Sequence, residues 1–568
     1  MARLTPEEIL KISEPIEQVY GNIVDALLVN LAKHFNTGKA LASQEWELQK
    51  LAELGQLTRE SMEIIAKLTG QNGVLIQAAL ENAAAAATKD IEPELKKGVK
   101  AGKIQAPDAE NVLVSKSIKQ SLNAYHLQAA NKLNLVNTTM LNSTLDLFKR
   151  VVVNTVNIER QMKAAQEILN TAAGKVITGA ESRTQALREA LGQIHKEGIT
   201  GFYDRAGRKW SPEAYVNMDT RTTVHNTAIE SVKLRQEDYG VDIFRVSRHS
   251  GARPLCYPYQ GKYYSWNDKS GTFTDGEGKR HRYSPLSSTS YGKPAGLFGI
   301  NCGHHPITVI PGVSIPRDMP EESKEENDRI YKESQQQRKL ERDIRYAKQK
   351  AAMLDAAGDK EGFEKEAVKI KQKQADYAAF CKETGRAKRL DRTQVFEYNK
   401  SVSSKATAAS NNAIHSKYKD YLGTKTISQT VSKVKNISDN GEKWLLDGYV
   451  KAVKKGDISA LIGIDTYLDV SRDVGKQLVG VTSVNGSEIK GYTTHFIDRI
   501  IGQTSTPHKG MRTGVTIKDV LNTLQNGEFK PIRTRTDGKQ SQQIIGNNNV
   551  VTVNPETGWL IQTNPKGE

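Results

Sequence analysis

The chain has 568 residues, of which 37% are hydrophobic, only 6% are aromatic and 26% are charged. This length corresponds to roughly three to five domains, and the low apolar content predicts an elongated, largely helical protein and not a compact enzyme with one large pocket. No run of about 18 apolar residues is present, which argues against a membrane-spanning helix. Three cysteines are too few for a disulfide framework in so long a chain.

The formal net charge of +16 at pH 7 favours a polyanionic partner, with nucleic acid as the first candidate. A basic protein with no nucleic-acid role is the alternative. The N-terminal sequence is acidic and lacks the basic-then-apolar order of a signal peptide, so we expect synthesis in the cytoplasm without export by that route.

Residues 1–239 are predicted to be helical. A run of five alanines within 82–88 has the highest intrinsic helix propensity. We interpret the apolar stripes of this region as helix-to-helix contacts and not as a cofactor site. Spacing of three and four residues, typical of one buried helix face, is followed by Ile9, Ile12, Ile16, Val19, Ile23, Leu27 and Leu31, and again by Leu141, Leu145, Phe148 and Val152.

The character of the sequence changes at residue 240. Residues 240–320 are rich in Gly, Pro, Tyr and Ser, and the alternating segment 241–246 predicts a strand. The frequent glycines indicate turns and hairpins. We therefore expect a small, loop-rich β domain here.

Residues 321–395 are highly charged and are predicted to form a helical hairpin. The apolar seam is shorter than the three or four heptads of an independent coiled coil, so we expect the hairpin to dock on a neighbouring part of the protein. Residues 396–442 are rich in Ser, Thr, Asn and Lys and are predicted to be a polar linker. The four-and-three spacing of the seam is followed by Leu340, Ile344, Ala347, Ala351 and Leu354.

Residues 443–568 return to a globular pattern. Helical patterns over 494–501 and 516–524 precede two strand-like segments, 550–553 and 559–563, whose connection has the composition of a hairpin turn. An α+β domain is expected. The predicted fold class is therefore multidomain and mainly α, with a helical N-terminal half, a small β domain, a charged helical hairpin and a C-terminal α+β domain.

Two cysteines and two histidines of the β region form a candidate metal site. Cys256 and Cys302 supply thiolates, and His249 and His304 supply imidazoles, which together are the ligand set of a structural zinc site. A small domain with few large apolar residues gains much stability from a bound metal. Alternatively, the cysteines are buried small hydrophobes and the histidines bond loop carbonyls. A catalytic Cys–His pair is disfavoured because no third orienting group is evident.

The central region contains an ordered set of motifs: Arg221-Thr222-Thr223, residues 246–254 (VSRHSGARP), Cys256, Gln260-Gly261, Tyr291-Gly292, residues 296–304 (GLFGINCGH) and Pro311-Gly312. Taken in this order, the motifs resemble the phage minor capsid protein 2 family. Two further segments, 46–55 and 340–345, are also similar, so the resemblance covers roughly residues 10 to 395. One departure is Gly303, where a basic residue is expected.

This resemblance implies a virion protein present in few copies, in the capsid interior or at the portal vertex, that is made in the host cytoplasm and assists head morphogenesis. It implies portal and capsid proteins and phage DNA as partners. The positive charge fits a position beside packaged DNA, because contacts to phosphate need no readout of the bases.

Four segments of the last hundred residues carry a second resemblance: 495–500 (HFIDRI), 515–520 (VTIKDV), 551–558 (VTVNPETG) and 560–563 (LIQT). Together they resemble the barnase–EndoU–colicin–RelE-like nucleases that are found fused to phage head proteins. The resemblance implies an RNase-like domain with RNA as its substrate and no catalytic metal.

Metal-free RNA cleavage needs a group that accepts or donates a proton and cations that bind the phosphate. His495 titrates near neutrality, and Arg499, four residues later on the same helix face, is a planar phosphate ligand. Thr552 and Thr563 on the paired strands are predicted to donate hydrogen bonds to the phosphate. Further phosphate-binding residues are predicted to be His508, Arg512, Lys530, Arg533 and Arg535.

A minor capsid protein that carries an RNase-like domain is the leading interpretation. A nuclease toxin with a virion-delivery scaffold, and a DNA-binding packaging accessory without catalysis, are the alternatives. For the C-terminal site, the alternative is that His495 caps a surface helix and Arg499 is a solvated charge.

Overall fold

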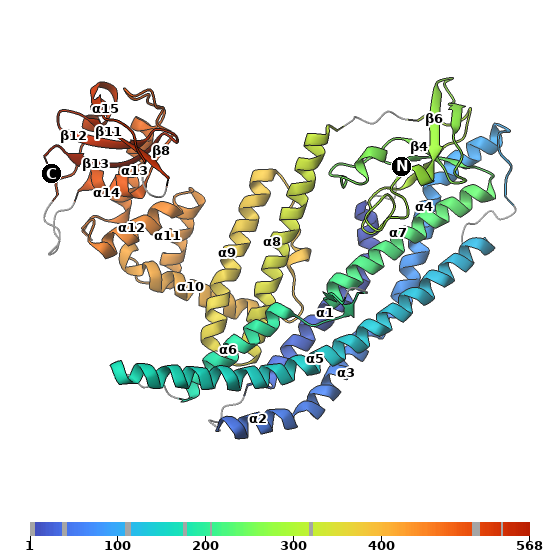
Figure 1. Cartoon of the computed structure of the whole chain (residues 1–568), viewed down its shortest axis with the longest axis horizontal. Coiled ribbons are helices and arrows are strands. Elements are labelled where there is room, and N and C mark those ends of the chain that lie inside the picture. Colours follow the sequence, from blue (N-terminus) through green and yellow to red (C-terminus); the bar gives the residue numbers. More distant parts are fainter. Residues whose placement is uncertain are drawn as a thin grey trace. The chain divides into compact units, whose positions relative to one another are not determined.

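The computed structural model describes residues 6–36, 42–107, 115–173, 179–204, 207–316, 322–459, 461–502, 512–534 and 538–567. The chain divides into two compact units at residues 406 and 407. The described residues are mainly helical, with small β sheets in both units (Figure 1), which confirms the predicted fold class. Within these residues, no helix combines the length and the apolar character that crossing a lipid bilayer requires.

The first unit begins with long helices around one apolar core. The predicted stripe of α1 is buried, with Ile23 and Leu27 fully inaccessible, and Ala83 and Ala84 of the alanine run are fully buried on α4. The absence of a bulky side chain lets neighbouring helices approach α4 closely. The helices are α1 (Pro6–Lys33), α2 (Ser43–Ala52), α3 (Leu54–Thr69), α4 (Asn72–Lys100), α5 (Lys116–Ala173) and α6 (Gly179–Glu197).

Helix α7 (Pro212–Asp238) follows a short antiparallel hairpin of β1 (Phe202–Tyr203) and β2 (Lys209–Trp210). Its start is well specified, because the Ser211 hydroxyl accepts a hydrogen bond from the Ala214 amide and Pro212 occupies the first turn. The fully buried Arg235 guanidinium pairs with Glu92 of α4 at 2.6 Å. This ion pair and the apolar core fix α7 against α4.

A five-stranded sheet follows α7, as the sequence predicts for residues 240–320. Its strand order is β5-β6-β4-β3-β7, and all pairs are antiparallel except the parallel pair of β4 and β6. Phe244 and Val246 pack with Ile229 of α7, so the sheet shares its core with that helix. The strands are β3 (Ile243–Val246), β4 (Tyr263–Ser265), β5 (Gly271–Thr274), β6 (Arg280–Pro285) and β7 (Pro306–Thr308).

Helices α8 (Lys324–Ala356) and α9 (Lys360–Thr384) form the predicted charged hairpin. The hairpin docks on the N-terminal helices as expected: Arg345 of α8 forms a bidentate pair with Glu213 of α7. Arg188 of α6 pairs with Asp359 at the turn between the two hairpin helices. The predicted seam residues Ile344, Ala347, Ala351 and Leu354 are each at most 2% exposed.

Residues 396–442 are not the polar linker that the composition predicts. They contain α10 (Lys400–Leu422) and α11 (Ile427–Asp439). The few apolar residues of this stretch recur at helical spacing, and Tyr418, Leu422 and Val434 are buried in the core of the second unit. A capping box of Thr426 and Gln429 also starts α11. Small and polar residues on the exposed faces made this stretch resemble a linker.

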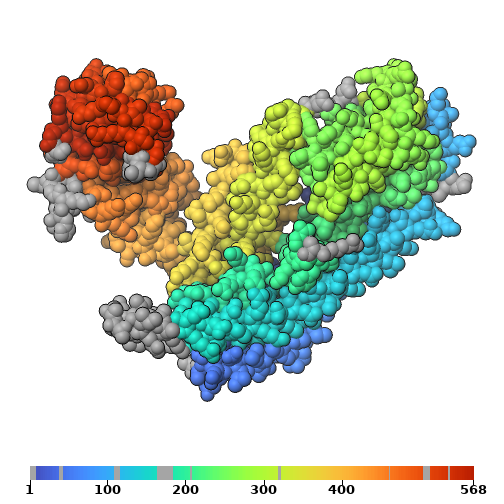
Figure 2. Space-filling view, viewed as in Figure 1, coloured from blue at the N-terminus to red at the C-terminus, as the bar shows by residue number. Residues whose placement is uncertain are grey.

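The second unit packs helices against an antiparallel sheet of order β10-β11-β12-β13-β8, with β9 also paired to β11 and β8 parallel to β13. In Figure 2 the orange and red parts of the chain, which contain these elements, form one continuous surface. The elements are α12 (Lys443–Lys455), α13 (Ile464–Leu478), β8 (Gly491–Tyr492), α14 (Thr494–Ile501), α15 (Ile517–Asn526), β9 (Glu528–Phe529), β10 (Arg533–Thr534), β11 (Gln540–Ile545), β12 (Asn549–Asn554) and β13 (Trp559–Pro565).

Candidate functional site

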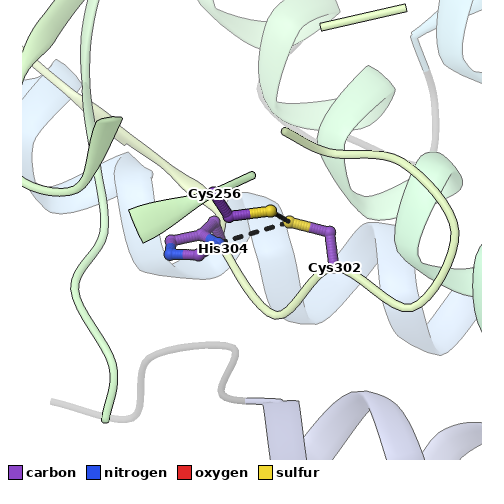
Figure 3. Close-up of side chains that lie close together, drawn as sticks. All are labelled: Cys256, Cys302 and His304. Atoms are coloured by element: carbon purple, nitrogen blue, oxygen red, sulfur yellow. Dashed lines mark hydrogen bonds between the residues drawn. The ribbon is translucent and has the colours of Figure 1, made fainter. Parts of the chain in front are cut away.

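Three of the four predicted metal ligands converge in the first unit (Figure 3). Cys256 lies in the turn after β3, and Cys302 and His304 lie on the loop that leads into β7. The two sulfur atoms are 3.8 Å apart, and the Cys302 sulfur is 3.3 Å from Nδ1 of His304. All three side chains are buried. We refer to these three residues as the Cys–His cluster.

His249, the fourth predicted ligand, lies beside the Cys–His cluster but is not part of it. Its ring packs against that of His304 with 4.3 Å between the centroids and a tilt of 40° between the ring planes. Its Nδ1 lies 3.1 Å from the Ser250 carbonyl oxygen. The side chain is also partly exposed, unlike the three clustered residues.

A further histidine, His225 of α7, contacts the same loop although no sequence motif indicated it. This ring is buried, and its Nε2 lies 2.8 Å from the carbonyl oxygen of His304. Burial lowers the pKa of His225, and the nearby Cys302 opposes that shift only in part. His225 is therefore a neutral imidazole at neutral pH. Its position within a helix with many buried residues gives no local sequence signal for this contact.

The two cysteines differ in acidity because of their surroundings. The hydrogen bond from the Cys256 thiol, followed by that from His304, lowers the pKa of Cys302 although burial opposes the shift. The pKa of Cys256 is raised, first by its hydrogen bond to Cys302 and second by burial. The loop therefore favours a thiolate at Cys302, and the whole donor set is one that suits zinc.

The second candidate site lies on α14 of the other unit. His495 and Arg499 are one helical turn apart, with 3.4 Å between His495 Nε2 and Arg499 Nε. The Arg499 guanidinium also donates to Asn564 of β13 at 3.0 Å. The predicted pairing of these two side chains on one helix face is therefore present.

The surroundings of His495 favour its neutral form. Burial, and then the positive charge of Arg499, lower the pKa of His495, whereas a hydrogen bond with the Gln562 side chain raises it. Gln562 and Asn564 alternate along β13 and so lie on one face of the sheet. Neither amide was predicted as a site residue, although both lie in or next to the motif 560–563.

A buried carboxyl also lies beneath this site. Asp498 of α14 accepts a hydrogen bond from the Tyr467 hydroxyl at 2.9 Å. Burial raises the pKa of Asp498 to about 6, and hydrogen bonding to Tyr467 only partly offsets this rise. The Arg512 guanidinium donates to the Asp498 carbonyl oxygen at 3.2 Å, which places this predicted phosphate ligand next to α14.

The two predicted threonines occupy different environments. Thr552 of β12 pairs in register with Gln562, so it lies on the sheet face that carries the His495 contact. Thr563 is fully buried, and its hydroxyl donates to the Val550 carbonyl oxygen at 3.1 Å. Because neighbouring strand residues alternate, Thr563 lies on the opposite face from Gln562.

Two further predicted cations, Lys530 and Arg533, are not grouped with His495. Lys530 and Arg533 are exposed in the β9–β10 region, beside β11. Strands β11 and β12 separate β10 from β13, which corresponds to about 14 Å at the usual strand spacing. His508 and Arg535 lie outside the described residues.

Comparison with known proteins assigns the first unit. Residues 4–382 match the family described as phage minor capsid protein 2. The chain is also 26% identical over 359 residues, or 60% of its length, to a protein named "Structural protein" of Lactococcus phage LL-H, and the match covers 86% of that protein. No solved structure gives a significant match. Because the family match spans well over half of the chain and includes the whole Cys–His cluster, the protein belongs to the phage minor capsid protein 2 family.

Proposed function

We propose that this minor capsid protein is associated with the portal in the phage head and carries an RNase-like domain in its second unit. Family membership makes it a structural component of the virion. The proposed partners are portal and capsid proteins, and the net charge of +16 supports contact with phage DNA through phosphates. The RNase-like activity is a separate part of the proposal and rests on the second unit alone.

The family match ends at residue 382, before the second unit begins at residue 407. This unit has its own apolar core of helices and sheet. A separate compact unit beyond the capsid region supports an additional function.

The observation that carries the RNase proposal is the pairing of His495 and Arg499 on α14, with Gln562 and Asn564 of β13 as their partners. A neutral His495 accepts the proton of the 2′-hydroxyl as its oxygen attacks the phosphorus, the P–O5′ bond breaks, and a proton from solvent neutralises the leaving 5′-oxygen. Arg499 and Arg512 stabilise the charge that develops on the phosphate. These steps use no metal, because the nucleophile belongs to the RNA itself and the protein supplies the base and the cations.

The test is cleavage of a fluorescent RNA by the full chain in the presence of EDTA. We expect His495→Ala to lower the cleavage rate at least 100-fold, because general acid–base catalysis contributes about 10²- to 10⁴-fold. His415→Asn is the matched control. This histidine of α10 belongs to the same unit, and its Nδ1 lies 2.8 Å from the Thr430 hydroxyl oxygen of α11. Equal cleavage by His495→Ala and the wild type would remove His495 from the proposed mechanism.

The other functions give different results in the same preparation. A packaging accessory without catalysis would bind DNA with a steep salt dependence and leave RNA intact. A toxin whose N-terminal part serves only for delivery would cleave RNA and be inhibited by an immunity protein encoded beside it. Quantitative mass spectrometry of purified virions tests the capsid assignment independently, because a structural component must be present in particles at a fixed copy number.

A further inference from the structure

We propose that Cys256, Cys302, His304 and His225 bind one zinc ion that joins α7 to the β sheet of the first unit. The ligands come from three separate places, namely α7, the turn after β3 and the loop before β7. Zinc bound at this point would hold together a region whose loops contain few large apolar side chains. This inference concerns the capsid unit and does not depend on the RNase proposal.

The distances within the Cys–His cluster match a tetrahedral zinc site. With Zn–S bonds of about 2.3 Å and Zn–N bonds of about 2.0 Å, two sulfur ligands lie about 3.8 Å apart and a sulfur and a nitrogen about 3.5 Å apart. The corresponding distances here are 3.8 Å between the sulfurs and 3.3 Å between Cys302 Sγ and His304 Nδ1. Two of the three donor-to-donor distances are therefore close to those of a tetrahedral zinc site, and all three donor atoms lie within 4.8 Å of one another.

Burial and composition support a metal over a simple hydrophobic contact. Cys256 and His304 are each 1% exposed and Cys302 is 6% exposed. Both cysteines are free thiols, with their sulfur atoms in contact but not bonded. Two thiols and an imidazole that meet in a buried loop form a soft donor set, which is the type that zinc selects.

His225 lies outside the set of three donor atoms that are within 4.8 Å of one another, so its ring must move closer to become the fourth ligand, and its orientation and burial favour that role. Its Nε2 donates to the His304 carbonyl oxygen, which leaves the lone pair on Nδ1. That Nδ1 is buried and has no hydrogen-bond partner. A hydrogen bond from the second ring nitrogen to a backbone carbonyl is the usual way in which proteins orient a histidine that binds zinc. The same contact ties the ligand on α7 to the loop that carries Cys302 and His304.

The experiment measures zinc in the full-length chain, purified under reducing conditions without chelator. We expect about one zinc per chain for the wild type and at least a tenfold loss of bound zinc in Cys256→Ser and Cys302→Ser. Cys381→Ser is the matched control, because Cys381 is also buried but packs between α8 and α9 against Ile344 and Tyr377. This control should retain the zinc of the wild type.

The wild-type chain alone keeps the test decisive if a variant does not fold. Cobalt added to the metal-stripped wild type should produce the absorption of thiolate-bound tetrahedral cobalt, and zinc should displace it. A folded wild-type chain that contains no zinc, binds no cobalt and has two freely reactive thiols at Cys256 and Cys302 would overturn the proposal. A disulfide between these two residues in the virion-derived protein would also overturn it.

A second comparison identifies the fourth ligand. We expect His225→Ala to weaken zinc binding 10- to 100-fold in competition with a chromophoric chelator, whereas His249→Ala, at the partly exposed ring beside the cluster, should change the affinity less than threefold. The opposite result would overturn the assignment of His225 and return the fourth position to His249.

Discussion

Asp498 is a buried carboxyl on α14, the helix that carries His495 and Arg499, and it accepts a hydrogen bond from Tyr467. Burial raises the pKa of Asp498 to about 6. A carboxyl whose pKa is higher in the folded than in the unfolded chain favours folding only while it is protonated. Stability should therefore fall as the pH rises from about 4 to 6 and stay lower above that range.

We predict that Asp498→Asn stabilises the second unit above pH 6 by about 2 kcal/mol, because the amide keeps an acceptor for Tyr467 and removes the buried charge. The gain should shrink below pH 6 and vanish near pH 3, below both the folded and the unfolded pKa, where Asp498 is mostly protonated in both states. Hydrogen exchange of the α14 amides at the two pH values measures the effect. Asp469→Asn, at an exposed carboxylate of α13, should produce no such gain, and equal gains for both variants would contradict the explanation.

Residues that act together but lie far apart in the chain mark the limit of what the sequence could predict. The ligand types of the Cys–His cluster were recognised from composition, yet Cys256 and Cys302 are separated by 46 positions. Nothing in the sequence shows which histidine the loops bring closest. His225 was missed because a single histidine in a buried helix has the same pattern as a core residue. Lys530 and Arg533 were grouped with His495 because the strand order was unknown.

At the scale of elements, periodic and capped segments were predictable. The apolar stripe of α1 and the seam of α8 gave the correct buried faces, because a regular spacing of large side chains specifies one side of a helix. The segments α10 and α11 were not predicted. Their exposed faces are rich in Ser, Thr and Asn, so tertiary packing of a few residues such as Tyr418 and Val434 outweighs their weak local signal.

The turn between α8 and α9 is attached to α6 by ion pairs of Arg188. Arg188 contacts two carboxylates there: Asp359, which is 5% exposed, and Glu361, which is 63% exposed. Asp359 also caps α9 by accepting a hydrogen bond from the Gly362 amide. We predict that Asp359→Ala destabilises the first unit by about 2 to 4 kcal/mol, because it leaves a partly buried guanidinium without its main partner and removes a helix cap.

Glu361→Ala is the matched control, since it removes the exposed partner of the same arginine and should change stability little. Urea denaturation monitored by circular dichroism measures both variants. Equal destabilisation by the two substitutions would show that the position of Asp359 at the helix start is not what secures the hairpin.

At the scale of the whole molecule, the family match and the two compact units divide the chain at nearly the same place. We predict that a chain ending at Ala406 is still incorporated into particles, because the first unit contains its own core and the residues shared with the family. The same truncation should abolish RNA cleavage by particle extracts. Quantitative mass spectrometry of virions made with the truncated gene measures incorporation, and absence of a folded, expressed product from the particles would contradict the prediction.

The end of the family match before α10 has an evolutionary consequence. Mutations that affect capsid assembly would lie in the part of the gene that encodes the first unit. Mutations that affect the proposed RNase function would lie in the part that encodes the second unit. Recombination between related phages near codon 400 would then replace the second unit and leave the capsid region unchanged. We therefore expect relatives that share the first four hundred residues but have unrelated C-terminal domains.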